Sequence, residues 1–331
     1  AFCVGTLAIT INGPSQIVPS AVLTNANCFG VCDGTATMSS VGGNGGYGYS
    51  IAPAGPTVVG NLISGLCANT VYTVTSTDIN GCSGTTTISI TQPTLVQVSV
   101  TGSTNVSCNG GCDGTVTVSG SGGTGAITYS IAPGAPCVPA QVVSGTFTNL
   151  GANTYTITAS DVNGCSATTT ITITEPPVFS LSVTATQDVG CAGGCDGTAS
   201  VIGNGGTPNY TYTISPSVPC LPSQVTAGNF GNLGANTYTV QGTDANGCTA
   251  TITFTINEPG ILITNVVSST SPSCQPGCDG TATMTSVGGN GGYVYSVNPA
   301  ATVTGNVISG LCAGITYTIT STDTKGCSGT S

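Results

Sequence analysis

The stretch Cys28-Phe29-Gly30-Val31-Cys32-Asp33-Gly34-Thr35 sets the organisation of this 331-residue chain. The pattern Cys-x-x-x-Cys-Asp-Gly-Thr returns three more times, at steps of 80 to 83 residues, beginning at Cys108, Cys191 and Cys274. Each copy opens a block that closes with a Gly-Cys pair, at Cys82, Cys165, Cys248 and Cys327. A fixed period with matching landmarks indicates tandem copies of one structural unit.

Between these landmarks, Thr, Val, Ile and Tyr alternate with polar residues over short stretches that are broken by Gly, Asn and Pro. This pattern is typical of β-strands, and no helical period is present. Six or seven short strands in each block predict an all-β chain of four tandem immunoglobulin-like β-sandwiches. The blocks meet at prolines such as Pro93 and Pro259. Because these joints are short, we expect a semi-rigid, rod-like chain of domains stapled by disulfides.

The block boundaries give the predicted domains 15–93, 94–176, 177–259 and 260–331, preceded by the segment 1–14. The first and fourth blocks share Val-Gly-Gly-Asn-Gly-Gly-Tyr, whereas the second and third share Asn-Leu-Gly-Ala-Asn-Thr-Tyr. The tyrosine that starts the penultimate strand of each block, for example Tyr155, is expected to pack in the core and bond to backbone, like the corner tyrosine of sandwich domains.

The composition excludes several functions. Charged residues make up 4% of the chain, Lys+Arg is 1 and His is 0, with a net charge of −10. One cation cannot replace the counterions of a nucleic acid, so no nucleic-acid partner is expected. Without His the usual general base is missing, so we predict no enzymatic activity and no cofactor. No apolar run is long enough to cross a bilayer, so membrane insertion is not expected.

The 17 cysteines are four per block plus Cys3. Regular cysteines in small units indicate disulfides formed in an oxidising compartment, so the protein is expected outside the cell or on its surface. A zinc site fits less well, because Cys-x-x-x-Cys differs from the usual knuckle spacing. Sequence alone leaves three connectivities per block. We predict outer pairs that bracket each sandwich, Cys28–Cys82, Cys108–Cys165, Cys191–Cys248 and Cys274–Cys327. We predict inner pairs Cys32–Cys67, Cys112–Cys137, Cys195–Cys220 and Cys278–Cys312.

Two further motifs have simple interpretations. The Asp-Gly pair that follows each second cysteine, at Asp33 in the first block, is ordinary turn chemistry. A calcium site would need six to eight oxygens, and each block offers only two recurrent carboxylates. Asn105 and Asn209 lie in sequons and are candidate glycosylation positions.

The run from Tyr155 to Cys165, Tyr-Thr-Ile followed by Asp-Val-Asn-Gly-Cys, resembles the SprB-type repeat of Bacteroidota surface adhesins and gliding-motility proteins, and is similar to the end of a PKD-type sandwich. The resemblance covers all four blocks and implies a secreted, cell-surface β-sandwich repeat. That family pattern has one cysteine before Asp-Gly, so the pairing of the second cysteine is not part of the resemblance.

The N-terminal segment aligns with the end of the first block: Cys3 matches Cys82 and Ile11 matches Ile90. Residues 6–12 therefore read as a final-type strand, namely Thr6, Leu7, Ala8, Ile9, Thr10, Ile11 and Asn12. The fourth block stops at Ser331, before that strand. We predict a structural subunit of an extracellular filament or adhesin stalk, in which residues 6–12 of one copy complete the fourth domain of the next, with Cys3 at that junction. The alternative is a glycan- or surface-binding adhesin module within a longer continuous repeat chain.

Overall fold

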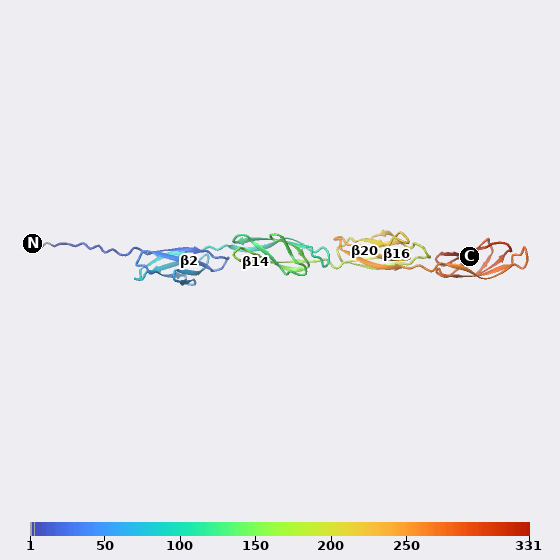
Figure 1. Ribbon diagram of the computed structural model, residues 1–331, viewed down its shortest axis with the longest axis horizontal. Helices are drawn as coiled ribbons and strands as arrows, with labels where there is room; N and C mark the ends of the chain where they lie inside the picture. Colours follow the sequence, from blue (N-terminus) through green and yellow to red (C-terminus); the bar gives the residue numbers. More distant parts are fainter. Residues whose placement is uncertain (1, 3) are drawn as a thin grey trace. The chain divides into compact units, whose positions relative to one another are not determined.

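The computed structural model describes residue 2 and residues 4–331. Within them the chain forms 28 strands and no helix (Figure 1), which confirms the all-β expectation. The chain divides into two compact units, one reaching Val106 and including Gly110–Thr174, the other holding Ser107–Asn109 and Glu175–Ser331. Each unit contains two of the predicted sandwiches.

Every sandwich has a four-stranded antiparallel sheet in which the first and second strands lie beside the fifth and fourth. In chain order across the four sandwiches these strands are β1 (Val18–Thr24), β2 (Gly34–Val41), β4 (Thr57–Val59) and β5 (Leu62–Leu66); β8 (Thr94–Thr104), β9 (Gly114–Gly123), β11 (Ala140–Val143) and β12 (Thr146–Leu150); β15 (Ser180–Gln187), β16 (Gly197–Asn204), β18 (Ser223–Thr226) and β19 (Asn229–Leu233); β22 (Ile263–Thr270), β23 (Gly280–Val287), β25 (Thr302–Thr304) and β26 (Val307–Leu311).

The facing sheet has three strands, the third, sixth and seventh of each sandwich. They are β3 (Gly48–Ala52), β6 (Tyr72–Thr77) and β7 (Ser83–Ile88); β10 (Thr128–Ala132), β13 (Asn153–Ser160) and β14 (Ser166–Ile173); β17 (Thr211–Ser215), β20 (Asn236–Thr243) and β21 (Thr249–Ile256); β24 (Val294–Asn298), β27 (Thr318–Thr322) and β28 (Ser328–Thr330). A four-stranded sheet facing a three-stranded one in this order is the constant-type immunoglobulin arrangement.

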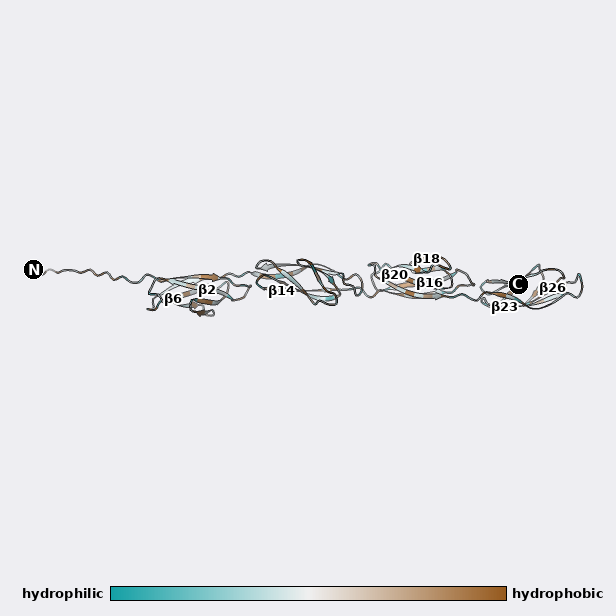
Figure 2. Cartoon of the chain, in the orientation of Figure 1, coloured by the Kyte–Doolittle hydropathy of each residue, from teal (hydrophilic) through white to brown (hydrophobic). Residues whose placement is uncertain are grey.

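Alternation along the strands builds each core. In β2 the side chains of Ala36 and Met38 are buried while their neighbours face outward, as the period of two in a strand requires. Hydrophobic residues, brown in Figure 2, lie on strands of all four sandwiches. Nine buried residues form the core of the first sandwich and nine that of the third, eight that of the second, and four that of the fourth.

The corner tyrosine has the expected structural role. Tyr155 and Tyr238 are fully buried and donate their hydroxyl hydrogens to the carbonyl oxygens of Gly151 and Gly234, at 3.1 Å in both cases. In the first sandwich the hydroxyl of Tyr72 instead accepts the backbone N–H of Cys67 at 3.0 Å. A buried hydroxyl that bonds to backbone satisfies a polar atom that would otherwise destabilise the core.

Candidate assembly sites

The inner disulfides are local staples at one end of each sandwich. The structure joins Cys32 to Cys67, Cys112 to Cys137, Cys195 to Cys220 and Cys278 to Cys312, across 25 to 35 residues of chain. Each bond ties the loop between the first and second strands to the segment near the fifth strand. The third cysteine differs in position between the two block types, yet reaches the same loop.

The predicted outer pairs are wrong. Cys28 bonds to Cys165 rather than Cys82, Cys108 to Cys248 rather than Cys165, and Cys191 to Cys327 rather than Cys248. The first cysteine of each of the first three blocks thus bonds the last cysteine of the following block. The Cα atoms are 5.5 to 5.7 Å apart, the ordinary separation for a disulfide. Residues 107–109, which include Cys108, belong to the same compact unit as Cys248.

Strand direction explains this correction. Five strands, β2 to β6, separate the Cys28 loop from the turn at Cys82, so the loop and the turn lie at opposite ends of the sandwich. The eight residues of β2 alone span about 26 Å, whereas a disulfide cannot bridge Cα atoms more than about 7 Å apart. The same reasoning applies to Cys274–Cys327, so all four predicted outer pairs fail for one physical reason.

The path of the chain brings consecutive blocks together at these ends. Ala26, in the Cys28 loop, donates its N–H to the carbonyl oxygen of Thr91 at 3.1 Å, just before the next block begins. In that next block Thr94 pairs with Gly123, and Thr124 donates its N–H to Asp161 at 2.8 Å. The loop of one block therefore lies beside the Asp-x-Asn-Gly-Cys turn of the following block.

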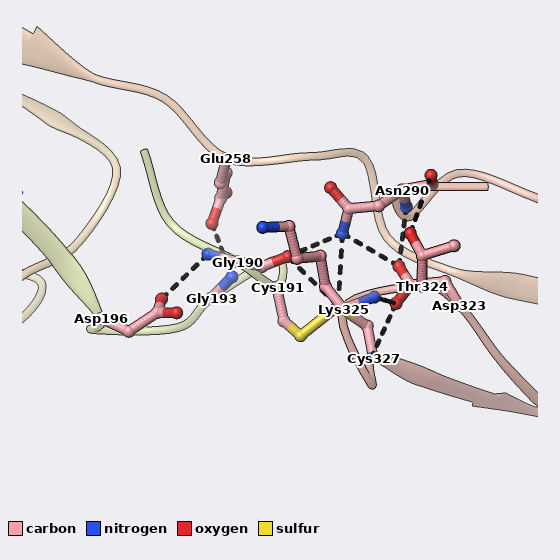
Figure 3. The surroundings of a disulfide bond; sticks show 10 residues. All are labelled: Gly190, Cys191, Gly193, Asp196, Glu258, Asn290, Asp323, Thr324, Lys325 and Cys327. Carbon is pink, nitrogen blue, oxygen red and sulfur yellow. Dashed lines mark hydrogen bonds between the residues drawn. A yellow bond between two sulfur atoms is a disulfide. The ribbon is translucent and has the colours of Figure 1, made fainter. Parts of the chain in front are cut away.

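The Cys191–Cys327 junction shows how the two blocks are held (Figure 3). The side-chain amide of Asn290 donates to the carbonyl oxygen of Gly190 at 2.8 Å and to Asp323 Oδ2 at 3.0 Å. Gly190 donates its own N–H to Asp196 Oδ1 at 2.9 Å. Asn290 thus links Asp323 of the fourth block to Gly190 of the third block. Gly190 in turn bonds to Asp196, the Asp-Gly aspartate of the third block.

The other two junctions repeat this arrangement with a different asparagine. Asn163 Nδ2 donates to the carbonyl oxygen of Asn27 at 3.2 Å, and Asn246 Nδ2 donates to that of Ser107 at 3.0 Å. The accepting carbonyl always belongs to the residue before the first cysteine. In the fourth block Lys325 occupies the position of Asn163 and Asn246, and Asn290 from the glycine-rich loop takes over. Sequence reasoning missed the asparagine donors, although the Asn-Gly-Cys run that contains Asn163 and Asn246 was visible in three blocks.

A buried aspartate shapes each Asp-x-Asn-Gly-Cys turn. Asp161 Oδ1 accepts the N–H groups of Asn163 and Cys165, each at 2.9 Å, and its Oδ2 accepts that of Thr124. Burial acts to raise the pKa of Asp161, but the backbone N–H donors, Thr124 first, outweigh it and hold the pKa below its ordinary value. The pKa values of Asp78, Asp244 and Asp323 are lowered in the same way. The charged carboxylate therefore fixes the backbone that presents the last cysteine.

The Asp-Gly aspartates bond to backbone within the loop between the first and second strands of a sandwich. Asp33 accepts the backbone N–H of Asn27 at 3.0 Å, and Asp279 accepts that of Ser273 at 2.8 Å. These bonds are the turn chemistry expected from the sequence. In residue 2 and residues 4–331, no group of three or more metal-ligating side chains is present. Nor does that part of the chain contain a helix that could cross a bilayer.

Two cysteines in the described part of the chain form no disulfide. Cys82, the last cysteine of the first block, and Cys274, the first cysteine of the fourth, are both free and exposed. Their counterparts in the other blocks form the three junction disulfides. Cys3, expected at an intermolecular junction, lies outside the described residues.

The predicted donor strand is exposed and pairs with no other strand. Residues 6–12 lie outside every sheet, and Leu7, Ile9 and Ile11 expose 86%, 77% and 90% of their surface. At the other end of the chain, β28 has three residues, whereas β14 and β21 have eight each. Tyr317 and Leu311 are only partly buried, while their counterparts Tyr155 and Leu150 are fully buried.

The two sequon asparagines lie on the surface. Asn105 Oδ1 accepts the backbone N–H of Thr174 at 3.0 Å, and Asn25 Oδ1 accepts that of Thr91 at 2.9 Å in the first block. Asn105 thus has a structural role in its own sandwich. Asn209 sits in a loop with a φ of 83°.

Comparison with known proteins gives one family. The SprB repeat matches residues 97–136 and 183–219, in the second and third sandwiches. No curated protein sequence matches the chain significantly.

Comparison with solved structures gives chains of low similarity. The eight N-terminal immunoglobulin domains of Down Syndrome Cell Adhesion Molecule have 12% identity and a TM-score of 0.32, covering 96% of this chain and 48% of theirs, so the chain spans about half their length. Three N-terminal domains of the bacteriophage RB49 outer capsid protein Hoc have 13% identity, a TM-score of 0.32 and coverages of 73% and 99%. Cadherin domains 3–6 of Protocadherin Gamma B2 have 12% identity, a TM-score of 0.29 and coverages of 94% and 98%.

The disulfides fit an extracellular protein. The second and third of its immunoglobulin-like sandwiches are similar to the SprB repeat.

Proposed function

We propose that the protein is a structural subunit of an extracellular filament or adhesin stalk. Copies assemble head to tail when residues 6–12 of one copy add to the fourth sandwich of another as its final strand. Strand addition of this kind satisfies main-chain hydrogen bonds and fills side-chain pockets at alternate positions. The contact joins two different surfaces, so it continues as an open chain of copies.

The edge of the fourth sandwich supports the acceptor role, and this is the observation that carries the proposal. In the third sandwich the ladder between β20 and β21 runs from Thr243↔Thr249 to Asn236↔Ile256. In the fourth sandwich the ladder of β27 with β28 covers three pairs, extended by the mutual bonds of Ile319 and Ser331 at 2.8 and 2.9 Å. Residues 315–317, which align with the start of β20, lie in no strand, and unpaired backbone beside a sheet readily accepts another strand.

The acceptor core is also short of apolar side chains. Ile173 and Ile256, from the last strands of the second and third sandwiches, are 1% exposed and complete their cores. The fourth sandwich has no counterpart in its core cluster of Ala282, Met284, Ile308 and Ile319. A strand with apolar residues at alternate positions would cover Tyr317 and Leu311.

The donor has the matching pattern. Ile9 and Ile11 align with Ile88 and Ile90, which are 6% and 4% exposed in the first sandwich. Burying two isoleucines that are now exposed contributes about 4 kcal/mol, in addition to the new ladder. Thr10 aligns with the outward-facing Ser89, so the segment presents apolar residues to one side only.

The test uses matched substitutions in the donor. Ile9→Asp with Ile11→Asp places charges in the acceptor core, while Thr10→Asp adds a charge on the outward side of the same strand. Negative-stain microscopy and sedimentation are expected to show filaments for the unmodified chain and Thr10→Asp, and soluble monomers for the double variant and for a chain lacking residues 1–12. Filaments that persist in the double variant and the deletion would rule out strand exchange.

A further inference from the structure

We propose that Cys274 of one copy forms a disulfide with Cys82 of a second copy, covalently locking the head-to-tail junction. This inference rests on the proposed assembly and adds a second, chemical link to it. Three bonds in the chain already follow one rule, in which the first cysteine of a block bonds the last cysteine of the next block. Applied across a junction between copies, the rule pairs the two cysteines that the described chain leaves free.

The half of the junction around Cys274 is preformed. Ser273 donates its N–H to Asp279 Oδ1 at 2.8 Å, as Gly190 does to Asp196 Oδ1 at 2.9 Å. The carbonyl oxygen of Gly190 is the one that accepts Asn290 of the following block. Ser273 occupies the position of Gly190 and is held by the same kind of bond, here to Asp279. Its carbonyl oxygen would therefore accept the asparagine of a following block, as that of Gly190 does.

The half around Cys82 is preformed as well. Cys82 donates its N–H to Asp78 Oδ1 at 2.9 Å, the bond that Cys327 makes to Asp323 at 2.9 Å. Asn44 Nδ2 donates to Asp78 Oδ2 at 3.0 Å, as Asn290 Nδ2 does to Asp323 Oδ2 at 3.0 Å. The first block also carries Asn80, at the position from which Asn163 and Asn246 reach the preceding block. It therefore offers both of the donor types used inside the chain.

Strand exchange would bring these halves together. Residues 6–12 would end the fourth sandwich of one copy, and the chain would then enter the first sandwich of the next through Pro14. Inside the chain, the last strand of the first sandwich leads into the second through Pro93 in the same way. The first sandwich of the incoming copy thus takes the place of a following block, with its Cys82 turn beside the Cys274 loop.

The reaction is thiol–disulfide exchange with a disulfide oxidant, for which oxidised glutathione serves in the assay. The Cys82 thiolate attacks a glutathione sulfur, forming a mixed disulfide and releasing one glutathione thiolate. The Cys274 thiolate of the other copy then attacks the Cys82 sulfur and releases the second. Two protein thiols are oxidised, and one oxidised glutathione becomes two glutathiones, which take up the two protons.

Complementary single variants give a sharp test. All proteins carry Cys3→Ser, with the unmodified chain in parallel, and are incubated with oxidised glutathione. On non-reducing denaturing gels the parent is expected to form a ladder in steps of 32.1 kDa. Cys82→Ser alone and Cys274→Ser alone should remain monomers. Their equimolar mixture should stop at a covalent dimer, because Cys274 of the first variant meets Cys82 of the second.

Peptide mapping of the dimer band should identify Cys82 linked to Cys274. Free thiols at both positions in the oxidised parent, homodimers of either single variant, or an intrachain Cys82–Cys274 bond would overturn the proposal. So would the finding that Cys82 of the protein isolated from its cells is bonded to a cysteine outside these 331 residues.

Failure of this link is distinguishable from failure of strand exchange. In a Cys82→Ser, Cys274→Ser double variant, filaments that form but dissociate fully in denaturant show that strand exchange works without covalent bonding between copies. If those filaments form while the parent gives no ladder, the disulfide proposal alone fails. If the parent gives a ladder that is unaffected by deleting residues 1–12, strand exchange alone fails.

Discussion

Removing the Cys28–Cys165 disulfide tests the pairing between blocks, which differs from the Cys28–Cys82 pair predicted from the sequence. The perturbation is Cys28→Ser with Cys165→Ser, which removes one bond and creates no new unpaired thiol. The matched single variant is Cys82→Ser, because Cys82 is free and exposed. If the outer bonds instead closed each block on itself, Cys82→Ser would be damaging as well, because it would remove a Cys28–Cys82 bond.

The expected magnitude follows from the closed loop. Cys28 and Cys165 are 137 residues apart, and cross-linking a loop of that length lowers the entropy of the unfolded chain enough to stabilise the fold by about 5 kcal/mol. Real disulfides often contribute less, typically 2–4 kcal/mol. With a guanidinium slope of about 4 kcal/mol per molar, the full effect would move the unfolding midpoint down by about 1 M.

The assay is guanidinium unfolding of monomeric protein, followed by circular dichroism and tyrosine fluorescence. The double variant should show an earlier transition, while Cys82→Ser should stay within about 0.5 kcal/mol of the parent, as expected for a surface position. The double variant loses the Cys28 bond under either pairing, so Cys82→Ser discriminates between them. A Cys82→Ser variant that is destabilised by several kcal/mol would show that the first block is closed on itself. It would refute the strand-direction reasoning.

Two other outcomes follow from the described contacts. Stability should be constant from pH 7 to about pH 5 and fall below about pH 4. The folded state lowers the pKa values of Asp78, Asp161, Asp244 and Asp323 below the ordinary 3.8, so acid protonates these carboxylates more readily in the unfolded chain and favours unfolding. A flat profile down to pH 2 in thermal unfolding would contradict this. Tyr238→Phe should lower the free energy of unfolding by about 1 kcal/mol, because the carbonyl of Gly234 loses its buried hydroxyl donor, whereas Tyr293→Phe, whose hydroxyl bonds to Gly288 at an exposed site, should cost less in the same denaturation assay.

Much of the fold could be predicted from the sequence, because its signals are local. Alternation in stretches such as Thr35 to Ser39 identifies strands from neighbouring residues alone, and the Asp-Gly turn at Asp33 follows from the chemistry of two residues. The inner staple from Cys32 to Cys67 needs only the knowledge that one loop returns to one end of a sandwich. Composition likewise supports an expectation without any structure: with Lys+Arg of 1, no nucleic-acid partner is expected.

The outer cysteines show where local patterns stop being sufficient. Cys28 and Cys82 bracket a block in sequence, but pairing depends on which end of the sandwich each one occupies. That follows from the number of strands between them, and an odd number, five, places them at opposite ends. The strand count was within reach of the sequence; the asparagine that bridges the junction was not, since Asn290 lies 100 residues from Gly190 along the chain.

The sequence by itself determined the repeat, the strands of each block and the disulfide chemistry of the cysteines, because each is written in residue type and spacing. Only the tertiary structure decided that the disulfides connect neighbouring blocks and that Cys82 and Cys274 stay free. It also revealed the partly uncovered Tyr317 in the fourth sandwich. These features depend on distances between segments that lie far apart in the chain, which spacing along the sequence does not specify.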